Sequence, residues 1–247
     1  AWKKECSLLL GLHNPGVDIG ALRHEMQAIG FTRVWLLQEL IDQFPQRAHF
    51  WLAPSRESLD VSDDILKAYA TLADEKSRDL FVALLDQRLN AVTEGLPRPD
   101  PENAYLPPDL RRPSGALRFI DCGAYVGDTI ENFRRLGYEF AEIAAFEPDP
   151  AHYPKLAKAL RTERASLFPC GVWNCTQQLR FVSNDAASHV ASNGDTMIQV
   201  VALDDALSGF SPTFIKMDIE GAEDVALLGA REMITAHRPR LAISAYH

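Results

Sequence analysis

From Leu117 onward, short apolar segments typical of strands alternate with amphipathic segments that have helical spacing. Strands are predicted at 117–121, 142–146, 166–169, 214–217 and 241–245, and helices at 129–136, 153–161 and 222–236. Two more segments, 179–182 and 198–202, are predicted as a hairpin or as added strands around a polar loop at 183–196. Strands that alternate with helices of this length form a mostly parallel sheet with helices on both faces. The sequence therefore predicts an α/β domain over residues 117–247.

The preceding part of the chain has a different organisation. Residues 7–12, 19–29 and 32–37 form a strand–helix–strand pattern, which normally makes a parallel crossover. Two amphipathic helices follow. Six prolines between residues 95 and 116 exclude regular structure. We expect a partial α/β and helical region at 1–94, a connector at 95–116 and the main domain at 117–247.

Composition limits the possible partners. The 247 residues carry a formal net charge of −9, and the basic residues are scattered, so nucleic acid is not an expected partner. No apolar run approaches the ~20 residues of a membrane span, and no export signal is visible, so we expect a cytoplasmic protein. The four cysteines lack zinc-ligand spacing and are expected to be free thiols without a metal.

The chain stops on an apolar strand at 241–245. A bare apolar edge invites aggregation, because its backbone groups are unpaired. We therefore expect either that C-terminal strands are missing or that another chain covers this edge, as in a homo-oligomer.

A glycine-rich turn follows the first strand of the main domain. Gly123 and Gly127 let the backbone turn tightly between Asp121 and Asp128 and approach a ligand closely. The helix that follows presents free N–H groups, which suit a carboxylate or phosphate. Because open parallel sheets bind ligands at the carboxyl ends of their strands, we expect a ligand site here.

Two further acidic residues follow later strands. Glu147 lies roughly 20 residues after the turn, as expected of an acid that binds two ribose hydroxyls. Asp218 follows the strand at 214–217. Three acids at one crevice favour a cationic ligand over a pyrophosphate. The sulfonium and ammonium of S-adenosylmethionine are such charges, which Asp121 and Asp218 complement.

A nicotinamide dinucleotide is the alternative ligand. Its turn has the pattern GxGxxG, in which the second glycine admits the pyrophosphate. Here Tyr125 occupies that position and Asp121 precedes the turn, so a diphosphate is both crowded and repelled. A methyltransferase is favoured over an NAD-linked oxidoreductase, and a non-catalytic cofactor-binding module is the third interpretation.

The chain resembles the FkbM family of S-adenosylmethionine-dependent methyltransferases in four segments: FIDCGAYVGDT, AFEPDP, FIKMDIEGAEDVALLGA and RPRLAISAYH. The most specific piece is KMDIEGAE combined with the terminal SAYH. The resemblance covers about residues 105–247. It implies a seven-stranded Rossmann-like methyltransferase sheet and O-methylation of a hydroxyl on a sugar, glycan or secondary metabolite.

The resemblance also implies roles for individual residues. The methionine-binding turn comprises Asp121, Cys122, Gly123, Ala124, Tyr125, Gly127, Asp128 and Thr129. Glu147 holds the ribose, Pro148 and Asp149 shape the adenine side, and Gly171 and Val172 lie near the adenine.

A base assists methyl transfer to an alcohol, because the oxygen must lose its proton. The catalytic candidates are Asp218, Glu220 and His247, and Asp218 is favoured because it ends a strand above the expected cofactor. Glu223 is expected instead to be a helix N-terminal acid stabilised by the dipole. Lys216, in an apolar strand, is expected to pair with a neighbouring carboxylate.

Overall fold

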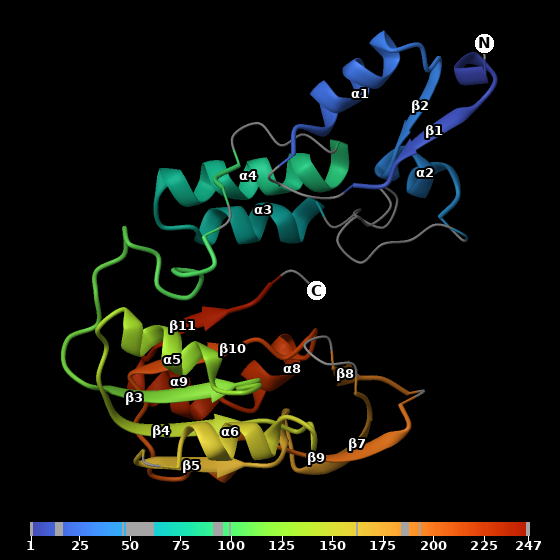
Figure 1. The fold of residues 1–247 in the computed structure, drawn as a ribbon. Coiled ribbons are helices and arrows are strands. Elements are labelled where there is room, and N and C mark those ends of the chain that lie inside the picture. Colours follow the sequence, from blue (N-terminus) through green and yellow to red (C-terminus); the bar gives the residue numbers. More distant parts are fainter. Residues whose placement is uncertain are drawn as a thin grey trace. The chain divides into compact units, whose positions relative to one another are not determined.

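A computed structural model describes residues 2–12, 17–45, 47, 62–90, 96–98, 100–161, 163–183, 188–192 and 194–245 (Figure 1). The chain divides into two compact units, Ala1–Pro101 and Glu102–His247. Among the described residues, none of the helices combines the length and the apolar character that a membrane crossing requires.

The first unit contains a two-stranded parallel sheet and four α-helices within its described part. Its elements are η1 (Trp2–Lys4), β1 (Ser7–Leu10), α1 (Ile19–Ala28), β2 (Arg33–Leu36), α2 (Leu37–Gln43), α3 (Ser62–Thr71) and α4 (Glu75–Asn90). β1 and β2 pair in parallel, as the strand–helix–strand pattern predicts. The Asp18 carboxylate accepts a hydrogen bond from the Ala21 N–H at 2.8 Å and so caps α1.

The second unit is built on a five-stranded parallel sheet. Its strands are β3 (Leu117–Cys122), β4 (Phe140–Phe146), β5 (Ala165–Phe168), β10 (Phe214–Met217) and β11 (Arg240–Ile243). They lie in the order β11-β10-β3-β4-β5, and every neighbouring pair is parallel. The α/β, Rossmann-like fold predicted from the alternating pattern is thereby confirmed. In the described residues this sheet has five strands, however, and not the seven that the resemblance implies.

Helices cover both faces of this sheet, because side chains along each strand alternate between them. Phe119 and its neighbours on one face pack against α5 (Asp128–Arg135) and α6 (Tyr153–Ala159). Ile120 and its neighbours on the other face pack against α7 (Leu203–Ala206), α8 (Glu223–Leu228) and α9 (Arg231–His237). The result is three layers with an apolar core on each side of the sheet (Figure 1).

A second, four-stranded sheet follows β5 along the chain. It contains β6 (Gly171–Val172), β7 (Gln177–Val182), β8 (His189–Val190) and β9 (Thr196–Val201), in the order β6-β9-β7-β8. β7 and β9 pair antiparallel, as the predicted hairpin requires, while β6 is parallel to β9. The hairpin thus belongs to a separate sheet rather than to an extension of the main one.

The prediction of a single helix at 222–236 is wrong. The chain forms two helices there, α8 and α9, which are separated at Gly229. A Cβ on Gly229 would lie 2.1 Å from the carbonyl oxygen of Trp173, so another segment passes too closely for any side chain. The Asp204 carboxylate accepts hydrogen bonds from the N–H groups of Glu232 and Met233, both at 2.9 Å. A residue of α7 therefore caps the start of α9.

We expect Phe119→Ala to lower the free energy of unfolding by about 3–5 kcal/mol. The Phe119 ring is fully buried and lies 5.2 Å, 5.5 Å and 5.7 Å, between centroids, from the rings of Phe133, Phe140 and Phe214. Urea denaturation measures the change. Met197→Ala, at an exposed site, should stay within about 0.5 kcal/mol of the wild type. Equal losses in the two variants would contradict this view of the core.

Candidate functional site

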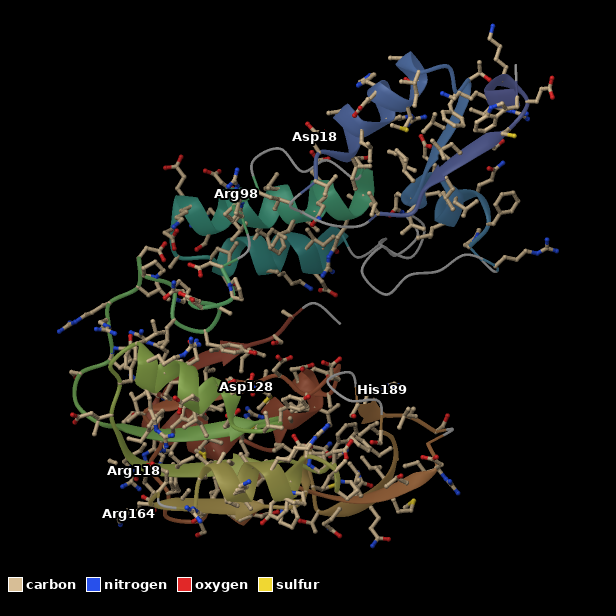
Figure 2. The ribbon with its side chains drawn as sticks, viewed as in Figure 1. Asp18, Arg98, Arg118, Asp128, Arg164 and His189 are labelled. Carbon is tan, nitrogen blue, oxygen red and sulfur yellow. The ribbon has the colours of Figure 1, made fainter. Side chains whose placement is uncertain are left out.

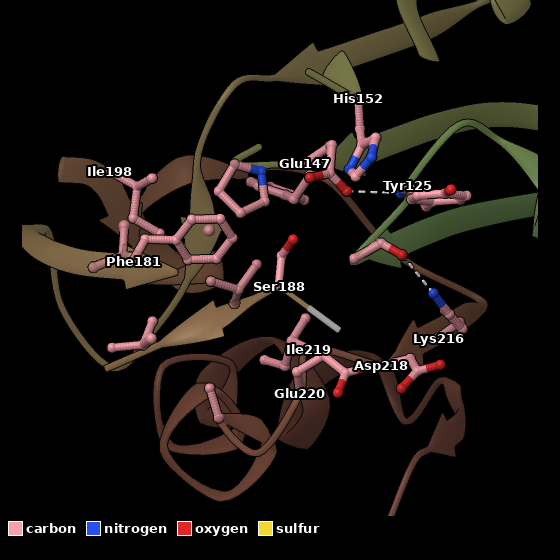
Figure 3. A pocket seen from close by; sticks show the side chains of 18 of the residues that line it. Tyr125, Glu147, His152, Phe181, Ser188, Ile198, Lys216, Asp218, Ile219 and Glu220 are labelled. Carbon is pink, nitrogen blue, oxygen red and sulfur yellow. Dashed lines mark hydrogen bonds between the residues drawn. The ribbon is translucent and has the colours of Figure 1, made fainter. Parts of the chain in front are cut away.

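The order of the strands reverses between β3 and β10. The chain runs from β3 outward through β4 and β5, and then returns to β10 and β11 on the other side of β3. Open parallel sheets bind ligands at the carboxyl ends of the strands beside such a reversal. A pocket opens there, lined by the segments that follow β3, β4 and β10, by Tyr105 and by the four-stranded sheet (Figure 3).

Gly123 brings the loops after β3 and β10 into contact. Its φ is +77°, and a Cβ there would lie 2.0 Å from the Asp218 carbonyl oxygen, so only glycine fits. The Gly123 N–H donates to the Phe146 carbonyl at 3.1 Å, and the Asp218 N–H donates to the Cys122 carbonyl at 3.1 Å. The carboxyl ends of three neighbouring strands are thus held together beside the pocket.

Glu147 lines the pocket directly after β4. Its Oε2 accepts a hydrogen bond from the Tyr125 N–H at 2.7 Å, and its Oε1 accepts one from the Asp149 N–H at 2.8 Å. Tyr125 has a φ of +48°, a left-handed conformation that costs a non-glycine residue energy. Burial raises the pKa of Glu147 above its ordinary value, although the two N–H donors lower it. The carboxylate is therefore held in one orientation before any ligand arrives.

Asp121 and Lys216 form a buried ion pair on the two central strands. They occupy paired positions of β3 and β10, and Lys216 Nζ lies 3.1 Å from Asp121 Oδ1. Asp121 is fully buried and Lys216 is 3% exposed. Burial alone would lower the pKa of Lys216, but the charges of Asp121 and Asp218 raise it, so Lys216 stays cationic. Lys216 Nζ also donates to the Gly123 carbonyl at 2.7 Å, and so holds the turn after β3.

Tyr105 reaches the pocket from the segment that precedes β3. Its hydroxyl donates a hydrogen bond to Asp218 Oδ2 at 2.7 Å. Lys216 Nζ lies 5.5 Å from the centroid of the same ring. Leu106, the next residue, is buried in the core beneath α5 and α6. Tyr105 therefore orients the Asp218 carboxylate from a segment that the sequence suggested was only a connector.

The loop after β10 presents Glu220 to the pocket in a strained conformation. Glu220 has a φ of +56° and Gly221 a φ of +93°. The Glu223 carboxylate accepts hydrogen bonds from the N–H groups of Ile219 and Gly221 at 2.8 Å and 3.0 Å. Glu223 thus stabilises the loop at the start of α8, while Glu220 lines the pocket.

Asp149 connects three segments beneath the pocket. It is fully buried, and its Oδ2 accepts hydrogen bonds from the hydroxyls of Ser183 at 2.6 Å and Ser188 at 3.1 Å. Its Oδ1 accepts one from the Ala151 N–H at 2.8 Å. Burial by itself raises the pKa of Asp149, but these hydrogen bonds lower it below its ordinary value. Asp149 stays ionised and fixes the ends of β7 and β8 to the segment that follows β4.

Most of the site residues predicted from the sequence meet at this pocket. Those that line it are Gly123, Tyr125, Asp128, Thr129, Glu147, Pro148, Gly171, Val172, Asp218 and Glu220. Asp128 lies in the first turn of α5 (Figure 2). The predicted residues that do not line it are Asp121, Cys122, Ala124, Gly127 and Asp149. Gly127 precedes α5 with a φ of +90°, and the other four are buried. His247 lies outside the described residues.

Several lining residues were not predicted. They include Tyr105, Phe146, His152, Phe181, Val190, Ile198, Val200, Ile219 and Ala222. The His152 ring contacts the Tyr125 ring edge-on, 4.5 Å between centroids. The strand residues could have been suspected from the alternating apolar residues of β7 and β9, whereas Tyr105 gives no signal in a proline-rich segment.

The fold and the pocket at the strand reversal define a Rossmann-like ligand-binding domain. The model of the methyltransferase FkbM domain matches residues 121–247, and the chain belongs to the FkbM methyltransferase family. The predicted family resemblance is confirmed.

A solved structure supports the same assignment. It is the crystal structure of a methyltransferase FkbM from Methylobacillus flagellatus KT, which is 27% identical in sequence, with a TM-score of 0.73. The similarity covers 93% of this chain and 60% of that chain, so the present chain spans about three fifths of that relative. A comparison with curated proteins finds no match.

We expect Lys216→Met to lower the free energy of unfolding by about 3–5 kcal/mol, because it leaves the Asp121 carboxylate buried and unpaired. Urea denaturation measures the loss. The same substitution at Lys67, whose ion pair with Asp64 is largely exposed, should cost at most about 1 kcal/mol. Removing the second charge in Asp121→Asn/Lys216→Met should restore part of the loss. A Lys216→Met variant as stable as the wild type would show that the pair is not needed.

Proposed function

We propose that this chain is an S-adenosylmethionine-dependent methyltransferase that methylates a hydroxyl group of a sugar, glycan or secondary metabolite. Family membership supports the class of reaction. The main support for this choice of cofactor is Glu147, whose carboxylate lines the pocket and is fixed by two backbone N–H donors. An acid at this position of a Rossmann-like sheet is suited to binding the two hydroxyls of a ribose.

The lining residues fit the other parts of the cofactor. Gly123 lets the backbone approach a ligand, and the first turn of α5 offers N–H groups to a carboxylate. Asp218 lines the pocket on the side opposite Glu147, where its carboxylate can complement an ammonium group (Figure 3). When bound, S-adenosylmethionine supplies a methyl group on a sulfonium, which an oxygen nucleophile can accept.

In this proposal the protein contributes orientation and a base. Tyr105 donates to one oxygen of Asp218, which fixes the direction of its carboxylate. Asp218 then accepts the proton of the acceptor hydroxyl. Glu220 is suited to a contact with the acceptor, since its loop holds it at the pocket. Alignment of the acceptor behind the methyl group can lower the barrier by up to about 7–11 kcal/mol.

Two alternatives have weaker support. An NAD-linked oxidoreductase needs room and positive charge for a pyrophosphate, whereas Tyr125, Asp128 and Asp218 line this pocket. A non-catalytic module would keep the cofactor pocket without the chemistry. Titration with NADH, followed by fluorescence, distinguishes the first alternative, because the methyltransferase should not bind it.

We expect Glu147→Gln to weaken the binding of S-adenosylhomocysteine about ten- to hundredfold, because it replaces charged hydrogen bonds to the ribose with neutral ones. Isothermal titration calorimetry measures the affinity. Glu139→Gln removes the same charge from an exposed position and should leave the affinity unchanged. The proposal fails if the wild-type protein binds no S-adenosylhomocysteine or if Glu147→Gln binds it equally well.

We also expect S-adenosylhomocysteine to bind more weakly in acid. Burial raises the pKa of Glu147 above the ordinary value of 4.5, so Glu147 takes up a proton at a higher pH than an exposed glutamate does. Since ribose hydroxyls bind the ionised form better, affinity should fall as the pH drops through this raised pKa. Calorimetry from pH 7.5 to 4.5 tests this, and Glu147→Gln should lack that part of the pH dependence. An unchanged pH profile in the variant would assign the titration to another group.

A further inference from the structure

Tyr105 lies on a segment that is attached to the second unit on both sides of it. Before it, the carbonyl of Glu102 accepts a hydrogen bond from Asn132 Nδ2 of α5 at 2.7 Å. After it, Leu106 is buried in the core beneath α5 and α6. The Leu106 N–H also donates to the Asn103 carbonyl at 3.0 Å, which closes a turn that contains Tyr105. The position of Tyr105 at the pocket is therefore fixed by contacts outside the pocket.

The backbone of Asp218 is fixed by other residues. Its N–H donates to the Cys122 carbonyl at 3.1 Å, and its carbonyl oxygen would lie 2.0 Å from a Cβ on Gly123, so the two loops are in close contact. The carboxylate lies beyond these backbone contacts, and its Oδ2 accepts the hydrogen bond of the Tyr105 hydroxyl at 2.7 Å. Tyr105 thus acts on the direction of the side chain rather than on the course of the loop.

Lys216 is a second partner toward which this carboxylate can turn. The charge of Asp218 raises the pKa of Lys216, so the two charges interact. Lys216 Nζ also lies 5.5 Å from the centroid of the Tyr105 ring, a favourable contact for a cation. The last torsion angle of an aspartate side chain has no sharp preference. Without the Tyr105 hydroxyl, the carboxylate can therefore rotate toward the lysine and away from a ligand.

The proposed cofactor has its reacting group on the same side of the pocket as Asp218. In a ribose, the 2′ and 3′ hydroxyls share one edge of the ring, and the carbon that carries the sulfonium leaves the ring from another corner. With the hydroxyls bound to Glu147, the sulfonium is directed away from Glu147. Asp218 lines the pocket on the side opposite Glu147 (Figure 3). A base that takes the proton of the acceptor must also lie beside the oxygen that attacks the methyl group.

We infer that Tyr105 is a positioning residue, whose hydroxyl holds the carboxylate of Asp218 beside the methyl group that the cofactor transfers. This inference rests on the proposed function, and it concerns a residue that precedes the part of the chain matched by the family model. A carboxylate in this place attracts a positive charge at the site of transfer. The two residues together therefore make the pocket distinguish a ligand that is charged at this site from one that is neutral there.

Calorimetry with two ligands tests the inference. Sinefungin carries an amine, protonated at neutral pH, at the position of the transferred methyl group, whereas S-adenosylhomocysteine has a neutral thioether there. The two ligands otherwise carry the same groups, so the ratio of their affinities reports the charge at the site of transfer. We expect Tyr105→Phe to weaken the binding of sinefungin about two- to tenfold, the effect of one hydrogen bond, and to leave that of S-adenosylhomocysteine unchanged.

A double-mutant cycle shows whether Tyr105 acts through Asp218. Asp218→Asn removes the charge and should weaken sinefungin about ten- to hundredfold. Tyr105→Phe/Asp218→Asn should bind sinefungin as Asp218→Asn does, because the hydroxyl no longer has a charge to hold. If the two effects simply add, Tyr105 contacts the ligand independently of Asp218, and the inference is overturned.

Tyr153→Phe is the matched control. The Tyr153 hydroxyl donates a hydrogen bond to the Leu167 carbonyl at 3.3 Å, but Tyr153 does not line the pocket. This variant should keep both affinities. Tyr105→Met, which removes the hydroxyl with a different side-chain shape, should show the same selective loss as Tyr105→Phe and serves if that variant folds poorly. Circular dichroism confirms that each variant is folded.

The possible failures are distinguishable. If the wild-type protein binds neither ligand, both the proposed function and this inference are overturned. If it binds S-adenosylhomocysteine but not sinefungin, or if Tyr105→Phe keeps full affinity for sinefungin, the cofactor proposal stands and the inference is overturned. Equal weakening of both ligands also overturns the inference, because it would place Asp218 at the ammonium of the amino-acid part, which both ligands carry.

Discussion

The buried ion pair between Asp121 and Lys216 is the interaction on which the candidate site depends. Its two members come from adjacent central strands, and neither charge has access to bulk water. An unpaired charge in such a place costs several kcal/mol, so the aspartate on one strand requires the lysine on the other. The lysine also holds the carbonyl of Gly123, whose turn contacts Asp218. One cation therefore sets the geometry of two loops that line the pocket.

The electrostatics of the pocket follow from the same pair. Asp121 compensates the charge of Lys216. Among the described lining residues, the carboxylates of Asp218 and Glu220 are therefore not neutralised by this lysine. Such a pocket disfavours a pyrophosphate and favours a ligand that carries positive charge. This negative charge suits the sulfonium of the proposed cofactor, and it also favours neutral or cationic acceptors over anionic ones.

Much of the fold could be predicted from the sequence, because strands and helices alternate with clear apolar periods. Asp121 illustrates what such a pattern omits. It was predicted to complement the charge of the cofactor because it lies near the end of a strand, but its carboxylate is fully buried, pairs with Lys216 and does not line the pocket. The position of a residue along its strand can be read from the sequence. The residue it contacts on the next strand depends on the pairing register, which the sequence does not show.

Tertiary contacts explain the remaining differences. The break between α8 and α9 depends on Asp204, a residue of another helix, and on the close passage of Trp173 beside Gly229. No local propensity encodes either contact. The alternating apolar residues of β7 and β9 likewise predict a buried face, but not that this face lines the pocket, because the two strands pair in a separate sheet.

The hydrogen bonds of Asp149 have a consequence for protein engineering. A single carboxylate binds the residues on either side of the segment between β7 and β8, at Ser183 and at Ser188. Ser183 and Ser188 are thereby both held by the same oxygen of Asp149. Because Ser183 and Ser188 hold β7 and β8 to Asp149, a change of sequence between the two serines should leave these strands in their present register.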